Sequence, residues 1–179
     1  KTQYEGRALD DEDGVVVVAK NAEFEISETG ISIDGHDVTS VIRTPEIDNA
    51  ATMVARIPRV RALLVARQRG YAEIGPLVME GRDIGTVVFP DATVKIYLDA
   101  TPEERAARRS QDPSHGLSKA GEIRVVANAL ERRDRLDRTR HASPLTTASD
   151  AKVIDTTGVS IDSVVRRVLK IVNEQIENG

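Results

Sequence analysis

The stretch VKIYLDATPEE, residues 94–104, decides the fold of this chain. Val94–Leu98 is a short apolar run of strand length that ends at Asp99. Thr101 then precedes a proline at the first helical position, and Glu104 stands three residues after Thr101, which is the pattern of a capping box. A strand that leads directly into a capped helix is half of a βα unit, so this stretch predicts an α/β fold with a parallel sheet.

Two further apolar runs support the parallel sheet. Leu77–Met79 runs into Glu80-Gly81-Arg82-Asp83, and Lys152–Asp155 is followed by a helical pattern that begins at Ser160. Continuous apolar strands are typical of sheets that are buried on both faces. We therefore expect strands at all three runs.

The N-terminal part has a different pattern. Residues 1–14 are polar and acidic and predict a loop. Strand-like patterns at Val15–Lys20, Glu23–Ile26 and Ile31–Ile33 predict a small antiparallel sheet. Pro45 and Pro58 then each suit the first position of a helix.

Length and composition exclude several classes of protein. The 179 residues predict one compact unit, with an inserted subdomain as the open alternative, and 40% apolar with 30% charged residues excludes wholesale disorder. No apolar run approaches the roughly 20 residues of a membrane helix. The chain has no cysteine, which fits a reducing compartment, and we expect it to be cytoplasmic.

Two polar constellations are candidates for chemistry. Gly81-Arg82-Asp83 ends one apolar run, where ligands of parallel sheets bind; the alternative is an ordinary turn with a local ion pair. Residues 131–140 hold five arginines and three acids, and helical spacing places Arg133, Asp137 and Arg140 on one face. This pattern is typical of a helix face that binds the phosphate and sugar of a ligand. The alternative is a solvated helix face with salt bridges.

The sequence gives little support for an RNA-binding surface, a metal site or a phosphate loop. The net charge of −4 and the 3% aromatic content disfavour an RNA-binding domain. His36, His115 and His141 show no metal-ligand spacing, so we expect no metal site. No pair of glycines is followed by Lys-Ser/Thr as in a Walker A loop, so these residues contain no phosphate loop.

Taken together, the motifs resemble the bacterial cytidylate kinases, which phosphorylate CMP and dCMP with ATP and Mg²⁺. The resemblance runs from about residue 40 to residue 175, and its most specific element is GRDIGTVVFPDA, residues 81–92. The other matching segments are residues 42–46, 49–51, 58–61, 95–100, 103–106, 133–140 and 154–157.

The resemblance also implies roles for single residues. Thr52, Arg61 and Asp83 match positions that contact the cytosine, and Thr52 stands where the family usually has serine. Arg82 and Arg140 match arginines that bind the CMP phosphate, and Arg133 and Asp137 match residues that face the ribose. Of these, Arg133 and Arg140 are the expected catalytic residues. The candidates for the ATP side, where the lid begins, are Arg105, Arg108 and Arg109.

The fold that the resemblance implies is α/β, a three-layer parallel sheet of the nucleoside monophosphate kinase (P-loop) type with a small antiparallel insert subdomain. Here its first βα unit and phosphate loop are missing, so we expect the 179 residues alone to bind ATP poorly and to turn over little. The implied parts are a leading loop (1–14), a CMP-binding subdomain with the insert (15–75), a core (76–110), a lid with the arginine-rich helix (111–140) and a core strand with the C-terminal helix (141–179).

The expected activity is transfer of the ATP γ-phosphoryl group to CMP or dCMP by a monomer, with Mg²⁺ accompanying ATP and with no nucleic-acid or membrane partner. Two alternatives stay open. One is a CMP- or anion-binding fragment without catalysis, and the other is a kinase for another nucleoside monophosphate such as UMP.

Overall fold

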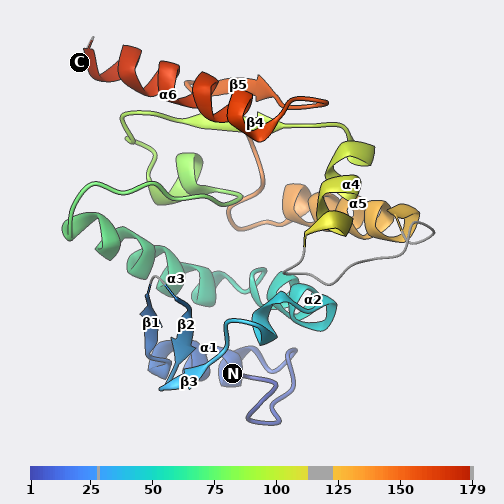
Figure 1. The fold of residues 1–179 in the computed structure, drawn as a ribbon. Helices are drawn as coiled ribbons and strands as arrows, with labels where there is room; N and C mark the ends of the chain where they lie inside the picture. The colour runs from blue at the N-terminus through green and yellow to red at the C-terminus, as the bar shows by residue number, and fades with distance from the viewer. Residues whose placement is uncertain (28, 113–122, 178–179) are drawn as a thin grey trace. The chain divides into compact units, whose positions relative to one another are not determined.

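The structure is a computed structural model that describes residues 1–27, 29–112 and 123–177. Its helices are α1 (Glu12–Asn21), α2 (Pro45–Val54), α3 (Pro58–Gly70), α4 (Pro102–Gln111), α5 (Ile123–Thr139) and α6 (Ile161–Glu177) (Figure 1). Its strands are β1 (Phe24–Ile26), β2 (Ile31–Ile33), β3 (His36–Asp37), β4 (Ile96–Asp99) and β5 (Lys152–Asp155). Short 3₁₀ turns lie at Val41–Arg43 and Tyr71–Glu73, and a π-helical turn lies at Ile84–Val88.

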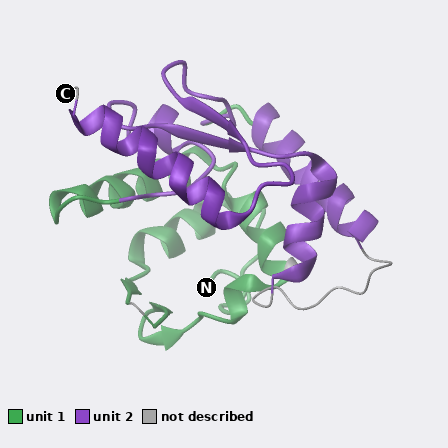
Figure 2. Cartoon of the chain, turned by 45° about the horizontal axis from the view of Figure 1, so that its top comes forward, with its two compact units in different colours: residues 1–77, 113–115, 140–142 green, residues 78–112, 116–139, 143–179 purple. Residues whose placement is uncertain are grey.

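The described chain divides into two compact units (Figure 2). Unit 1 comprises residues 1–77 and 140–142, and unit 2 comprises residues 78–112, 123–139 and 143–177. Unit 1 contains the antiparallel sheet with α1, α2 and α3, and unit 2 contains the parallel strands with α4, α5 and α6.

The core of unit 1 forms where α1 packs on α3. Val15 of α1 is buried against Ile57 and Val60, and Val54 and Leu64 pack around them. The prediction of a strand at Val15–Lys20, and of a loop that extends to residue 14, was therefore wrong. The helix begins at Glu12 because the Asp11 carboxylate accepts a hydrogen bond from the Gly14 backbone N–H at 3.0 Å.

The other elements of unit 1 agree with the sequence. β1 and β2 pair antiparallel, with Phe24 opposite Ile33 and Ile26 opposite Ile31. The tight turn from β2 to β3 places Asp34 and Gly35 at φ of 53° and 76°, as an Asp-Gly hairpin turn requires. The predicted helices are confirmed as α2 and α3, each with its proline in the first turn.

Unit 2 contains the parallel pairing that the sequence predicts. β4 and β5 run parallel from Ile96 opposite Lys152 to Asp99 opposite Asp155. The strand predicted at Leu77–Met79 is absent from the described structure: neither β4 nor β5 pairs with it, and Val78 is fully exposed. Without a neighbour, its backbone groups have no ladder to join.

Helices flank these strands in the chain as expected. The Thr101 side chain caps α4 by accepting from the Glu104 backbone N–H, and α4 packs against α5. The loop predicted at residues 111–121 lies mostly outside the described residues. In the part of the chain that the structure describes, no helix is both long and apolar enough to cross a bilayer.

Candidate functional site

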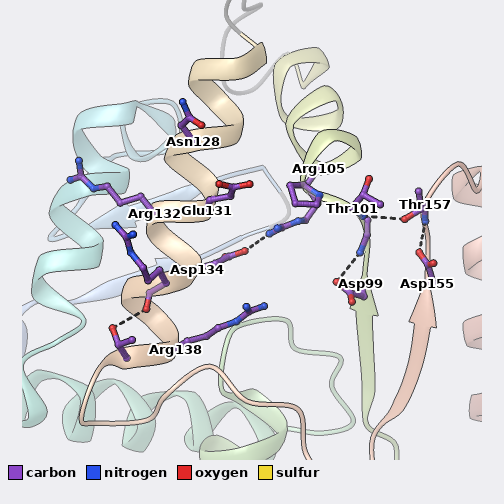
Figure 3. A pocket seen from close by; sticks show the side chains of 14 residues that line it. Asp99, Thr101, Arg105, Asn128, Glu131, Arg132, Asp134, Arg138, Asp155 and Thr157 are labelled. Atoms are coloured by element: carbon purple, nitrogen blue, oxygen red, sulfur yellow. Dashed lines mark hydrogen bonds and ion pairs between the residues drawn. The ribbon is translucent and has the colours of Figure 1, made fainter.

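Unit 2 contains an ion-pair cluster, which we call the Asp134 cluster: Arg82, Arg105, Asp134 and Asp137. Arg82 Nη1 donates to Asp134 Oδ1 at 2.5 Å, and Arg105 Nη1 donates to the other oxygen, Oδ2. Arg82 Nε lies 3.6 Å from Asp137 Oδ2. One carboxylate of α5 thus joins an arginine of the 81–83 loop to an arginine of α4; Figure 3 shows its contact with Arg105.

The charge of Asp134 is well compensated. Its side chain is only 8% exposed, and burial alone would raise its pKa. The hydrogen bonds from Arg105 and Arg82, together with their positive charges, outweigh burial and hold the pKa of Asp134 below its ordinary value. Asp134 is therefore ionised at neutral pH, and the two guanidinium groups remain beside each other although they repel.

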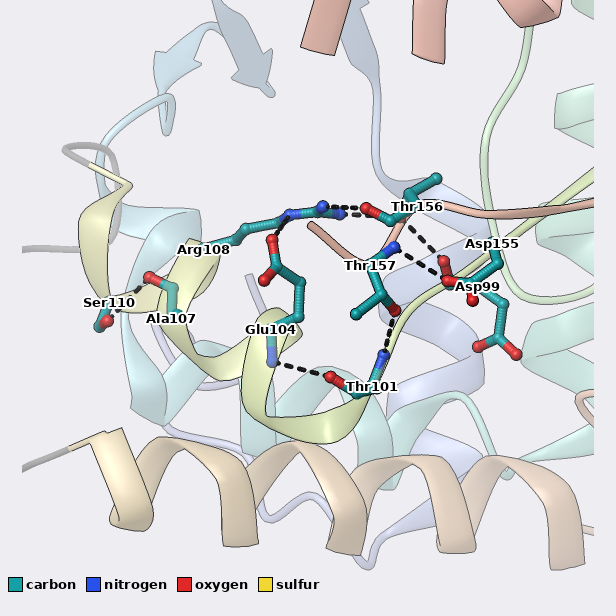
Figure 4. Close-up of polar contacts among 9 residues, drawn as sticks. All are labelled: Asp99, Thr101, Glu104, Ala107, Arg108, Ser110, Asp155, Thr156 and Thr157. Carbon is teal, nitrogen blue, oxygen red and sulfur yellow. Dashed lines mark hydrogen bonds and ion pairs between the residues drawn. The ribbon is translucent and has the colours of Figure 1, made fainter. Parts of the chain in front are cut away.

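A second network joins the carboxyl ends of β4 and β5 to α4 (Figure 4). Thr156 is buried, and its hydroxyl donates to the Asp99 carbonyl at 2.8 Å. Arg108 donates to that hydroxyl from Nη1 at 2.8 Å and to the Thr156 carbonyl from Nη2 at 2.5 Å, while its Nε donates to Glu104 at 2.9 Å. All three nitrogens of the Arg108 guanidinium thus donate inside unit 2.

Between these networks lies a pocket of about 770 Å³. It begins at the carboxyl ends of the parallel strands, with Asp99 and Thr101 from one side and Asp155 and Thr157 from the other (Figure 3). The remaining lining comes from α4 and α5: Pro102, Arg105, Asn128, Glu131, Arg132, Asp134, Arg135, Arg138 and Thr139, with Ala100 at the strand end. Ligands of parallel sheets bind at this edge, and the volume is within the range of small-molecule sites.

The loop that carries Arg82 and Asp83 owes its shape to the π-helical turn that follows it. The Asp83 carbonyl accepts from the backbone N–H groups of both Val87 and Val88, at 2.9 and 3.2 Å. Asp83 itself is buried at 6% exposure. Such turns often occur at functional sites, and this one was not predicted from the sequence.

Unit 1 contains three of the predicted site residues. Thr52 lies on α2, and its hydroxyl donates to the Asp48 carbonyl one turn earlier at 2.9 Å. Arg61 lies on α3 and is partly buried. Arg140 follows the last residue of α5 and is buried at 7% exposure.

Unit 2 contains the other predicted residues, and the structure brings only some of them together. Arg82, Arg105 and Asp137 meet in the Asp134 cluster. Arg108 belongs to the strand-end network, and Arg109 is the next residue of α4. Arg133 lies one turn before Asp137 on α5, as the spacing predicts.

Two functional candidates were missed from the sequence alone. Asp134 was counted among the acids of the arginine-rich segment but received no role, although its position three residues before Asp137 places both carboxylates on one helix face. Thr156 directly follows Asp155, the last residue of a predicted strand. Its position at a strand end would have been enough to make it a candidate.

The sequence of this chain matches a known protein family over most of its length. The family model described as cytidylate kinase matches residues 3–174. The chain belongs to the cytidylate kinase family. The match confirms the resemblance that the sequence motifs indicate. The chain is therefore an enzyme of the ATP-dependent nucleoside monophosphate kinase class.

Individual relatives support the same family. The chain is 45% identical over 174 residues to a cytidylate kinase of Geobacillus sp. (strain WCH70), covering 94% of this chain and 77% of the relative. It is 45% identical over 171 residues to a cytidylate kinase of Solibacter usitatus (strain Ellin6076), with coverages of 90% and 70%. A cytidylate kinase of Shigella sonnei (strain Ss046) is 45% identical over 170 residues, with coverages of 92% and 74%.

Proposed function

We propose that this protein binds CMP or dCMP and transfers the γ-phosphoryl group of ATP to it, giving CDP or dCDP. The observation that carries the proposal is the Asp134 cluster, in which two arginines converge in a chain that the cytidylate kinase family model matches almost throughout. Phosphoryl transfer depends on positioning and on charge compensation at the phosphates, and clustered guanidinium groups supply both.

We assign the substrate contacts as the resemblance implies. Thr52, Arg61 and Asp83 are proposed to recognise cytosine, with the Asp83 carboxylate accepting from its amino group. A buried acceptor of this kind rejects a base that cannot donate, because the carboxylate would then be left unpaired. Arg82 and Arg140 are proposed to bind the CMP phosphate, since a guanidinium can hold a phosphate through two parallel hydrogen bonds.

The remaining roles concern the ribose and ATP. Arg133 and Asp137 are proposed to face the ribose, and Arg133 and Arg140 to compensate the charge that develops during transfer. Arg105, Arg108 and Arg109 are proposed for the ATP side, with Arg108 acting through its contacts to Thr156.

Mg²⁺ is proposed to arrive with ATP as part of the substrate. Among the described residues, no group of three or more histidine and acidic side chains is arranged to hold a metal ion. When bound, the ion would neutralise charge on the phosphates. The chain's own contribution is the arginines that orient those phosphates.

A second candidate follows from the sequence itself, which contains no Walker A motif. The 179 residues would then bind CMP without transferring a phosphoryl group, since a phosphate loop positions the β- and γ-phosphates of ATP in kinases of this type. Titration with nucleotides separates the two candidates.

The test combines calorimetric titration with a coupled assay for ADP. The kinase proposal expects CMP to bind, and ADP to form with MgATP in the order CMP and dCMP before UMP. Binding of CMP without ADP formation supports the second candidate. Failure of CMP to bind at millimolar concentration, or faster turnover with UMP, contradicts the proposed specificity.

A further inference from the structure

Asp134 is buried between two arginines that come from different elements of unit 2. Arg82 precedes the π-helical turn and Arg105 lies on α4, while Asp134 itself is on α5. Each guanidinium takes a different oxygen of the one carboxylate. The carboxylate therefore sets the distance and the relative orientation of the two positive groups.

The contacts with Asp134 engage only part of each guanidinium. A guanidinium carries five N–H donors, and the contacts with Asp134 use one donor of each arginine. The Arg105 Nε atom is buried and has no hydrogen-bond partner among the residues that the structure describes. About one third of each arginine side chain is exposed, 33% for Arg82 and 32% for Arg105.

Charge supports the same interpretation. Two adjacent guanidinium groups repel each other, so without a shared anion they would separate. One ionised carboxylate holds them together and leaves these three groups with a net positive charge of one, while Asp137 lies farther from Arg82, at 3.6 Å from its Nε atom. Such a pair suits an anion with several oxygens, such as a phosphoryl group.

We propose that Asp134 is a positioning residue, which holds Arg82 in place to bind the phosphate of the nucleoside monophosphate and keeps Arg105, an arginine of the ATP side, next to it. This inference rests on the proposed function, because it takes a nucleoside monophosphate as the ligand. Asp134 contacts the arginines and acts on the phosphate only through them.

The same contacts also fit an opposite role, in which Asp134 competes with the phosphate and masks the arginines. The two roles predict opposite effects of Asp134→Asn, which keeps the shape of the side chain and removes its charge. Positioning predicts weaker phosphate binding in the variant, and masking predicts tighter binding.

The experiment measures the dissociation constants of CMP and of cytidine by calorimetry on the full chain. The dissociation constant of cytidine divided by that of CMP gives a ratio that isolates the contribution of the phosphate. We expect Asp134→Asn to reduce this ratio about tenfold or more, because charge-assisted hydrogen bonds lose their geometry, and to leave cytidine binding unchanged. The control is Glu103→Gln, which removes an exposed carboxylate of α4 and is expected to leave the ratio unchanged.

A conservative variant separates positioning from folding and from charge alone. Asp134→Glu keeps the charge but moves the carboxylate by one methylene, so we expect a reduced ratio at a nearly unchanged melting temperature. It also provides the test if Asp134→Asn does not fold.

The inference is overturned by an unchanged or increased ratio in Asp134→Asn, or by an unchanged ratio in Asp134→Glu. Equal weakening of CMP and cytidine, with a lower melting temperature, makes Asp134 a purely structural residue and also overturns it. If the unmodified chain binds CMP no better than cytidine, or binds neither, the proposed function itself fails, and this result is distinct from the others.

Discussion

Arg108 offers the sharpest test of how unit 2 holds its strand ends. The variant Arg108→Met keeps most of the aliphatic stem and removes the guanidinium. It therefore deletes the two hydrogen bonds to Thr156 and the pair with Glu104.

The size of the effect follows from what each partner retains. The Thr156 carbonyl still accepts from the Val159 backbone N–H, and the Thr156 hydroxyl still donates to the Asp99 carbonyl. Neither group is left without a hydrogen bond, so the cost is the net value of two charge-assisted bonds and not a desolvation penalty. The Arg108 side chain is 42% exposed, which lowers this value further. We expect a loss of about 2 kcal/mol in the free energy of unfolding of unit 2.

Urea unfolding followed by circular dichroism measures the loss, since the chain has no tryptophan to report by fluorescence. Hydrogen exchange of peptides that cover residues 152–160 assigns the loss to the strand ends. Glu104→Gln is the matched control, because it removes only the partly exposed i,i+4 pair and should cost about 0.5 kcal/mol or less. A loss in Arg108→Met no larger than that of the control would refute the reasoning.

Two further predictions concern Asp134 and Thr101. The pKa of Asp134 is lowered in the folded state, so its stabilising contribution is present above the ordinary aspartate pKa of about 4 and is lost as the pH falls through the lowered value. Unfolding measured between about pH 5 and pH 2 should therefore show a steeper loss of stability for the unmodified chain than for Asp134→Asn, and parallel curves would contradict this. Thr101→Ala removes the cap of α4 and should cost about 1 kcal/mol in urea unfolding, while Thr101→Ser should cost much less; equal losses would argue against the cap.

The elements with complete local signals were predicted correctly. α4 combines a capping threonine, a proline and a glutamate at fixed spacing, and β5 is an apolar run bounded by polar residues. In each case, short-range chemistry and the hydrophobic pattern indicate the same structure.

Where the prediction failed, the deciding interactions were not in the local pattern. Four successive valines at 15–18 favour a strand by propensity. However, Asp11 caps a helix there, and burial of Val15 against Val60 stabilises that helix. Leu77–Met79 has the pattern of a strand, but a strand also needs a hydrogen-bonded neighbour, and neither β4 nor β5 supplies one.

The candidate site was predictable residue by residue but not in its connections. The motifs singled out Arg82, Arg105 and Asp137, yet nothing in the sequence indicates that Asp134 lies between the two arginines. Asp134 is 52 residues away from Arg82 in the sequence and 29 residues away from Arg105. The contact with Arg105 depends on how α4 and α5 pack.

The parallel pairing of β4 and β5 also has a kinetic consequence. Thr156 and Asp99 are 57 residues apart, so the chain between them must be brought to a closed loop before the strands can exchange hydrogen bonds. α4 and α5 lie within that loop and form local contacts that need no such closure. We therefore expect the strand ends, and with them the contacts of Arg108 to Thr156, to form in a late, entropy-limited stage of folding, after the helices.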